Sequence, residues 1–195
     1  PPGETAFIAQ RMDELRAKGS KTPLQYRWVP YARISVQLKR AMIAAEDAKF
    51  AEHDGFDWDG IEKALEKNRK KGRVVAGGST ITQQLAKNLF LSPTKSYWRK
   101  GGEAVVAVLL EAMLPKQRIF ELYLNVIEWG DGVFGAEAAA QRYFGVSAAQ
   151  LSAEQAARLA AMTPSPRVFE RRPDSAYLDG RVATILARMP SAIVP

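Results

Sequence analysis

Residues 77–88 read GGSTITQQLAKN, a pair of glycines followed by hydroxyl residues and the start of an amphipathic pattern. Successive glycines are typical of a loop. Thr80 and Gln83 have the spacing of a capping box, which predicts that a helix begins at Thr80. Ile81 and Leu85 fall on one side of that helix, so this side is expected to face the core. The stretch therefore predicts a loop that leads into a partly buried helix.

The opposite side of this helix is polar, and two interpretations of it remain open. Gln84, Lys87 and Asn88 gather there together with Thr80. The stretch is either a loop and a capped helix with a solvated face, or an anion-binding device whose backbone N–H groups meet a phosphate. It is not a Walker loop, because Lys87 lies seven residues after Thr80 rather than beside it.

The rest of the chain is also helical in pattern. Apolar spacing, caps and breakers predict helices over about 35–45, 59–73, 97–113, 119–125, 152–162 and 175–189. Ser147 and Ser152 each precede a Gln by three residues, the spacing of a capping box. Glycines predict a flexible stretch over 130–135, and prolines predict a loop over 164–173. Because strand-like alternation is nearly absent and nothing divides the chain, we predict an all-α, mostly helical fold in a single domain over residues 1–195.

The composition excludes several kinds of chemistry. The chain has 195 residues, 47% of them hydrophobic and 25% charged, which is ordinary for a globular protein. It has no Cys, so disulfide scaffolds, thiolate metal sites and cysteine nucleophiles are excluded. A single histidine, His53, excludes a metal centre built from several histidines. Carboxylates, Lys, Arg, Tyr and hydroxyl groups remain to carry any reaction.

The positive charge is concentrated in one stretch. The net charge is +7, and residues 60–100 alone carry +8, from ten basic residues against Glu62 and Glu66. A local excess of this kind attracts anions. The charge therefore predicts an anionic partner: a phosphate group, a nucleic acid or an acidic membrane surface.

Two carboxylates stand at an unfavourable place. Glu46 and Asp47 end an otherwise apolar helix, where the helix dipole disfavours negative charge. Residues that break a local rule are candidate functional residues. In the alternative interpretation both carboxylates face solvent or pair with Lys49 or His53.

A second charged cluster opens the helix predicted over 97–113. Arg99 and Lys100 precede Glu103 by four and three residues, the spacing of ion pairs on a helix. The alternative is a phosphate clamp beside a second carboxylate.

Five blocks in this order resemble a known family. They are residues 46–57 (EDAKFAEHDGFD), 78–88 (GSTITQQLAKN), 99–103 (RKGGE), 119–145, which begins IFELYLN, and the helix over 151–161 that ends near Pro164. Over nearly its whole length the chain is similar to the monofunctional biosynthetic peptidoglycan transglycosylases and to the glycosyltransferase domain of class A penicillin-binding proteins.

The resemblance implies a lysozyme-like fold with two lobes and a cleft, and the polymerisation of lipid II into β-1,4-linked glycan strands. It implies that Glu46 is the general base that takes the proton of the acceptor's 4-hydroxyl, that the bond forms with inversion, and that undecaprenyl pyrophosphate leaves. It assigns a second catalytic role to Glu103 and a supporting one to Asp47. Positions that bind pyrophosphate or line the donor site map to Ser79, Thr80, Gln83, Gln84, Lys87, Asn88, Lys95, Arg99 and Lys100. Lys95 stands where relatives often carry Arg, so a point charge replaces a bidentate contact there.

The resemblance also implies the surroundings of the enzyme. The partners are lipid II, the growing glycan strand, the bacterial membrane and other cell-wall synthases, and no nucleic acid. No cofactor is required by the sequence and no set of metal ligands is visible, although a divalent cation, Mg or Mn, would suit a leaving pyrophosphate. The catalytic domain is expected on the periplasmic face of the bacterial cytoplasmic (inner) membrane. Because the chain begins at Pro1 without Met, we expect a further segment upstream of it, which could be a signal, an anchor or another domain. The resemblance implies a transmembrane anchor there, since relatives carry one and the substrate is a lipid.

Two other functions compete with this one. A lysozyme-like hydrolase or lytic transglycosylase shares the fold and the catalytic glutamate, but its leaving group is a sugar hydroxyl, which needs no cationic clamp for an anion. A basic nucleic-acid-binding module agrees with the net charge. No array of stacking aromatic residues accompanies the basic stretch, which disfavours that module.

Overall fold

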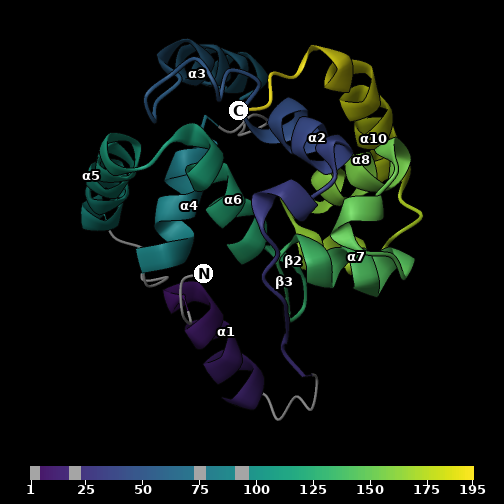
Figure 1. The fold of residues 1–195 in the computed structure, drawn as a ribbon. Coiled ribbons are helices and arrows are strands. Elements are labelled where there is room, and N and C mark those ends of the chain that lie inside the picture. The colour runs from purple at the N-terminus through teal and green to yellow at the C-terminus, as the bar shows by residue number, and fades with distance from the viewer. Residues whose placement is uncertain (1–4, 18–22, 73–77, 91–96) are drawn as a thin grey trace.

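A computed structural model describes residues 5–17, 23–72, 78–90 and 97–195, and the side chains of residues 6 and 97–100 lie outside this description. The fold is mostly helical (Figure 1). The first half contains α1 (Ala6–Ala17), β1 (Gln25–Tyr26), α2 (Val36–Glu46), α3 (Trp58–Lys71), α4 (Ile81–Phe90) and α5 (Tyr97–Met113). The second half contains α6 (Lys116–Val126), β2 (Glu128–Gly130), β3 (Val133–Phe134), α7 (Ala136–Phe144), α8 (Ala153–Met162), α9 (Pro166–Arg171) and α10 (Ala176–Arg188). Short 3-10 turns cover Tyr31–Arg33, Ala148–Gln150 and Met189–Ser191.

Side-chain caps set several helix starts. Ser35 accepts a hydrogen bond from the Gln37 amide at the start of α2, as its position predicts. The predicted capping boxes at Ser147 and Ser152 are both present, the second at the start of α8. Asp57 caps α3 through the Gly60 amide, so the helix begins at Trp58, one residue before the predicted start at 59.

The prediction of an all-α fold is wrong in one region. The glycine-rich stretch over 130–135, expected to be flexible, contains the end of β2, the turn and all of β3. β2 and β3 pair as an antiparallel hairpin, and β1 pairs with β3 in parallel to complete a small sheet. Pairs this short leave too little alternation to recognise in the sequence. The proline-rich segment contains α9 rather than only loop, because Pro166 occupies the first turn, where a helix tolerates proline. The helix α1 was not predicted.

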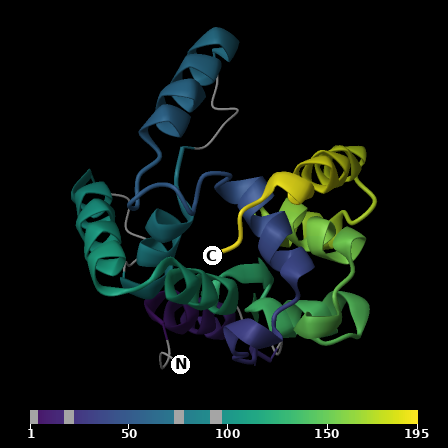
Figure 2. The ribbon, with the colours of Figure 1, turned by 45° about the horizontal axis from the view of Figure 1, so that its top comes forward.

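The core joins two groups of helices. α2 packs on α8 and α8 on α10, while α4 packs on α5 and α6, and Figure 1 shows the first group on one side of α6 and α5 on the other. Trp129, Tyr123 and Phe50 are completely buried between them. Figure 2 shows the basic helix α3 extending away from the other elements. Among the described residues, no helix is both long enough and apolar enough to cross a membrane.

Two glycines with positive φ, one at each end of α7, provide a test of this packing. Gly135 has φ +81° at the start of α7, and a Cβ atom there would lie 2.6 Å from the Asn125 carbonyl oxygen. Gly145 has φ +65° at the end of α7, with no heavy atom within 4 Å of an added Cβ. We expect Gly145→Ala to cost about 1 kcal/mol of unfolding free energy in urea titrations, the cost of the backbone conformation alone. Gly135→Ala should cost clearly more, and equal losses would contradict the close approach of Gly135 to Asn125.

Candidate active site

Glu46 is the last residue of α2, and two side chains hold its half-buried carboxylate. The Gln84 amide of α4 donates from Nε2 to Glu46 Oε2 at 2.9 Å. The Thr163 hydroxyl, just after α8, lies 2.6 Å from Glu46 Oε1. Three helices therefore fix the position of one carboxylate.

A buried tyrosine fixes the orientation of Gln84. The Tyr123 hydroxyl of α6 donates to Gln84 Oε1 at 3.0 Å. Burial, together with the negative charges of Glu46 and Asp47, raises the pKa of Tyr123 well above its usual value, so the hydroxyl keeps its proton. Because Oε1 of Gln84 is the acceptor of this bond, its NH₂ group must be the end that faces Glu46.

Asp47 is a structural centre next to Glu46, with a side chain only 2% exposed. Its carboxylate oxygens lie 2.9 and 3.0 Å from His53 Nε2, and its Oδ2 accepts a hydrogen bond from the Ile81 amide at 3.0 Å. Ile81 is the first residue of α4, where the helix dipole favours negative charge. The negative charge of Asp47 is therefore unfavourable for the dipole of α2, which it follows, but favourable for the dipole of α4, whose first amide it accepts from.

The structure gives Glu46 and Asp47 different surroundings, although the sequence left the role of both carboxylates open. Asp47 pairs with His53, as the structural interpretation holds. Glu46 bonds instead to Gln84 and Thr163, and Lys49 pairs with Asp59 at 2.9 Å. Of the two carboxylates, Glu46 is the more exposed, because it is half-buried whereas Asp47 is buried.

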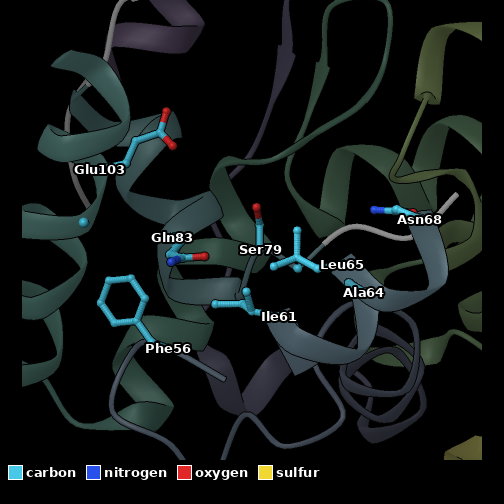
Figure 3. A pocket seen from close by; sticks show the side chains of 10 residues that line it. Phe56, Ile61, Ala64, Leu65, Asn68, Ser79, Gln83 and Glu103 are labelled. Carbon is cyan, nitrogen blue, oxygen red and sulfur yellow. The ribbon is translucent and has the colours of Figure 1, made fainter. Parts of the chain in front are cut away.

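Two neighbouring cavities share Gly78 and Ser79. One, of about 330 Å³, is lined by Glu46, Asp47 and Arg188 among others. The next, of about 320 Å³, is lined by Glu103 and Gln83 together with α3. Figure 3 shows Glu103, Gln83 and Ser79 around this second hollow. The predicted catalytic carboxylates thus line adjoining cavities on either side of the segment before α4.

The polar face predicted for α4 borders a third cavity, of about 280 Å³. Gln84, Lys87 and Asn88 line it together with Tyr123 and Thr163. Since Gln84 and Thr163 also hold Glu46, this cavity adjoins the carboxylate from another side. Lys87 is exposed there and available to an anion.

Thr80 and Gln83 form the predicted capping box. The Thr80 amide donates to Gln83 Oε1 at 3.0 Å, and the Gln83 amide donates to Thr80 Oγ1 at 3.3 Å. The Thr80 hydroxyl itself donates to the Gly55 carbonyl at 2.6 Å. Thr80 therefore shapes the cavity wall from a buried position, whereas Ser79 is exposed to it.

The charged cluster of α5 is described only in part. Arg99, Lys100 and Glu103 all lie in the first two turns of α5, and Glu103 is half-buried. The side chains of Arg99 and Lys100 lie outside the described residues, and so does the whole of Lys95.

Three residues of this region have no functional signal in the sequence. Thr163 and Arg188 follow or end helices far along the chain from Glu46, and no local spacing connects them to it. Tyr123 belongs to the block over 119–145, but its bond to Gln84 depends on the packing of α6 against α4.

The arrangement suits proton transfer from a hydroxyl group. A carboxylate with fixed orientation lies at a cavity, which is what a general base requires. A cation on the neighbouring surface, Lys87, can stabilise charge that develops on a leaving group.

Comparison with known proteins identifies the family. A family model described as Transglycosylase matches residues 13–190. The chain is 64% identical to a biosynthetic peptidoglycan transglycosylase of Dechloromonas aromatica (strain RCB), over all of this chain and 84% of that protein. Over the same shares it is 59% and 60% identical to proteins of that name from Janthinobacterium sp. (strain Marseille) and Herminiimonas arsenicoxydans. The chain therefore belongs to the transglycosylase family, alongside the biosynthetic peptidoglycan transglycosylases.

Proposed function

We propose that this peptidoglycan transglycosylase of the cell envelope polymerises lipid II into β-1,4-linked glycan strands, with Glu46 as general base. The observation that carries this role is the placement of Glu46, held by Gln84 and Thr163 at the wall of a cavity. Asp47, the neighbouring carboxylate, is occupied by His53 and the Ile81 amide and therefore supports the site from inside.

In the proposed reaction, Glu46 takes the proton of the acceptor's 4-hydroxyl as that oxygen attacks the anomeric carbon of the donor. The new glycosidic bond forms with inversion, and the bond to undecaprenyl pyrophosphate breaks with its electron pair on the leaving phosphate. Gln84 donates to Glu46 Oε2 and so holds the carboxylate in place during the transfer.

The leaving group requires fixed positive charge. We propose that Lys87, Arg99 and Lys100 bind the pyrophosphate, with Lys95 nearby, and that Glu103 positions the donor. Ser79, Gln83 and Asn88 would line the donor site, since they line the cavities around Glu46. These cavities would belong to one cleft between two lysozyme-like lobes.

The proposed setting is the periplasmic face of the bacterial inner membrane, where the lipid substrate resides. The glycan strand and other cell-wall synthases are the proposed partners. A divalent cation, Mg or Mn, would suit the phosphates of the leaving pyrophosphate. The described residues contain no group of three or more His, Cys, Asp or Glu side chains that could hold a metal ion. No step of the mechanism is assigned to it.

Product analysis distinguishes polymerisation from the lysozyme-like alternative. Purified protein is incubated with lipid II in detergent and, separately, with finished glycan strands. We expect strand formation from lipid II and no cleavage of finished glycan. Cleavage of glycan without strand formation would establish a hydrolase or lytic enzyme instead.

Lys87→Ala tests the proposed anion clamp. Loss of this charge should lower kcat/KM for lipid II about 10- to 100-fold, the size expected for hydrogen bonds to charged groups. The matched control is Lys70→Ala, since Lys70 pairs with Glu66 on the exposed face of α3. Initial rates of strand formation measure both variants, and equal rates for the two would remove Lys87 from the clamp.

A further inference from the structure

Thr163 stands between two acceptors. Its Oγ1 atom lies 2.6 Å from Glu46 Oε1 and 2.8 Å from the Ala160 carbonyl oxygen. A hydroxyl group has one proton and can also accept. If the hydroxyl donates to the Ala160 carbonyl, its oxygen can accept a hydrogen bond from a protonated Glu46. If it donates to Glu46, the carbonyl oxygen cannot donate in return, because it carries no proton.

The sequence explains why the Ala160 carbonyl is available. In a continuing helix this oxygen would accept from the amide four residues later, at position 164. That residue is Pro164, which has no N–H group. The end of α8 thus leaves an acceptor beside Thr163.

The other partner of Glu46 has no such freedom. Gln84 Oε1 is the acceptor of the Tyr123 hydroxyl, so only its NH₂ group faces Glu46. An amide NH₂ donates and cannot accept. Of these two partners, Thr163 alone can suit a carboxylate and a carboxylic acid in turn.

We propose that Thr163 is a positioning residue whose hydroxyl follows the protonation state of Glu46, an inference that rests on the proposed role of Glu46 as base. Before the reaction, the Thr163 proton points to Glu46 Oε1. As the acceptor's proton reaches Glu46, the Thr163 O–H rotates to the Ala160 carbonyl, and its oxygen accepts from the new acid group when the proton lies on Oε1. Loss of that proton to water returns the hydroxyl to its first orientation.

A second threonine distinguishes this role from simple helix capping. Thr184 of α10 donates to the Gly180 carbonyl at 2.9 Å and is exposed. Both threonines therefore bond to a carbonyl of their own helix, and Thr163 in addition bonds to a carboxylate. Thr184→Val is the matched control for Thr163→Val.

The test measures kcat and KM for lipid II with wild type, Thr163→Val, Thr163→Ser and Thr184→Val. Thr163→Val should lower kcat about 10- to 100-fold with little change in KM, as expected for a lost hydrogen bond to a charged group. Thr163→Ser, which keeps the hydroxyl, should stay within about threefold of wild type, a range set by retention of that bond. Thr184→Val should match wild type.

Three outcomes would overturn the inference: wild-type kcat in Thr163→Val, an equal loss in Thr163→Ser, or a change in KM alone. Thermal unfolding checks each variant, and if Thr163→Val unfolds, Thr163→Ala takes its place with the same expected loss. Glu46→Gln is assayed in parallel. If Glu46→Gln retains activity, the proposed function fails; if it is inactive while Thr163→Val is normal, only the inference about Thr163 fails.

Discussion

Glu46→Gln is expected to lower lipid II polymerisation by about 10²- to 10⁴-fold, the contribution of a positioned general base. The amide cannot accept the proton of the attacking hydroxyl. The fold should remain intact, because Gln has nearly the same shape as Glu. Its oxygen can accept from Gln84, and its NH₂ group can donate to Thr163, whose own proton then points to Ala160.

The measurement is the initial rate of strand formation, with Glu52→Gln as control. Glu52 lies six residues further on in the same block and is exposed. Glu52→Gln should retain the wild-type rate, and both variants should unfold at the wild-type temperature. Substantial polymerisation by Glu46→Gln would remove Glu46 from the role of base.

Asp47→Ala is expected to lower the free energy of unfolding by about 2–5 kcal/mol, because it leaves buried donors without an acceptor. The donors are His53 Nε2 and the Ile81 amide, and the lost charge also leaves the start of α4 uncompensated. Activity should fall as well, since α4 carries Gln84. Urea titration gives the stability, and activity is measured where the variant is folded.

The control for Asp47 is Asp59→Asn. Asp59 also pairs with a cationic side chain, Lys49, but its side chain is 70% exposed. Water screens such a pair, so its loss should leave the urea midpoint nearly unchanged. If Asp47→Ala were equally harmless, Asp47 would not anchor α4.

Helix starts could be predicted from the sequence because caps act locally. Thr80 with Gln83, and Ser152 with Gln155, each lie within one turn, so the pattern itself contains the interaction. The helix α5, predicted over 97–113 and found there, was bounded instead by a proline, Pro115, shortly after its last residue. The small sheet could not be predicted in this way, since its strands of two or three residues have too little alternation.

The partners of Glu46 were only partly predictable. The pattern places Gln84 on the polar side of an amphipathic helix, but its contact with Glu46 spans 38 residues and depends on how α4 meets α2. Thr163 is 117 residues from Glu46, next to a proline that indicates only a helix end. A contact of this kind is set by the packing of α2 against α8, which no local pattern encodes.

The most direct test compares the two products of the proposed reaction. Wild type and Glu46→Gln are incubated with lipid II, and released undecaprenyl pyrophosphate is counted against new β-1,4 bonds. In wild type we expect one new bond for each pyrophosphate released, and in Glu46→Gln almost neither product. Pyrophosphate release accompanied by free disaccharide, or equal bond formation by both proteins, would contradict polymerisation by a Glu46 base.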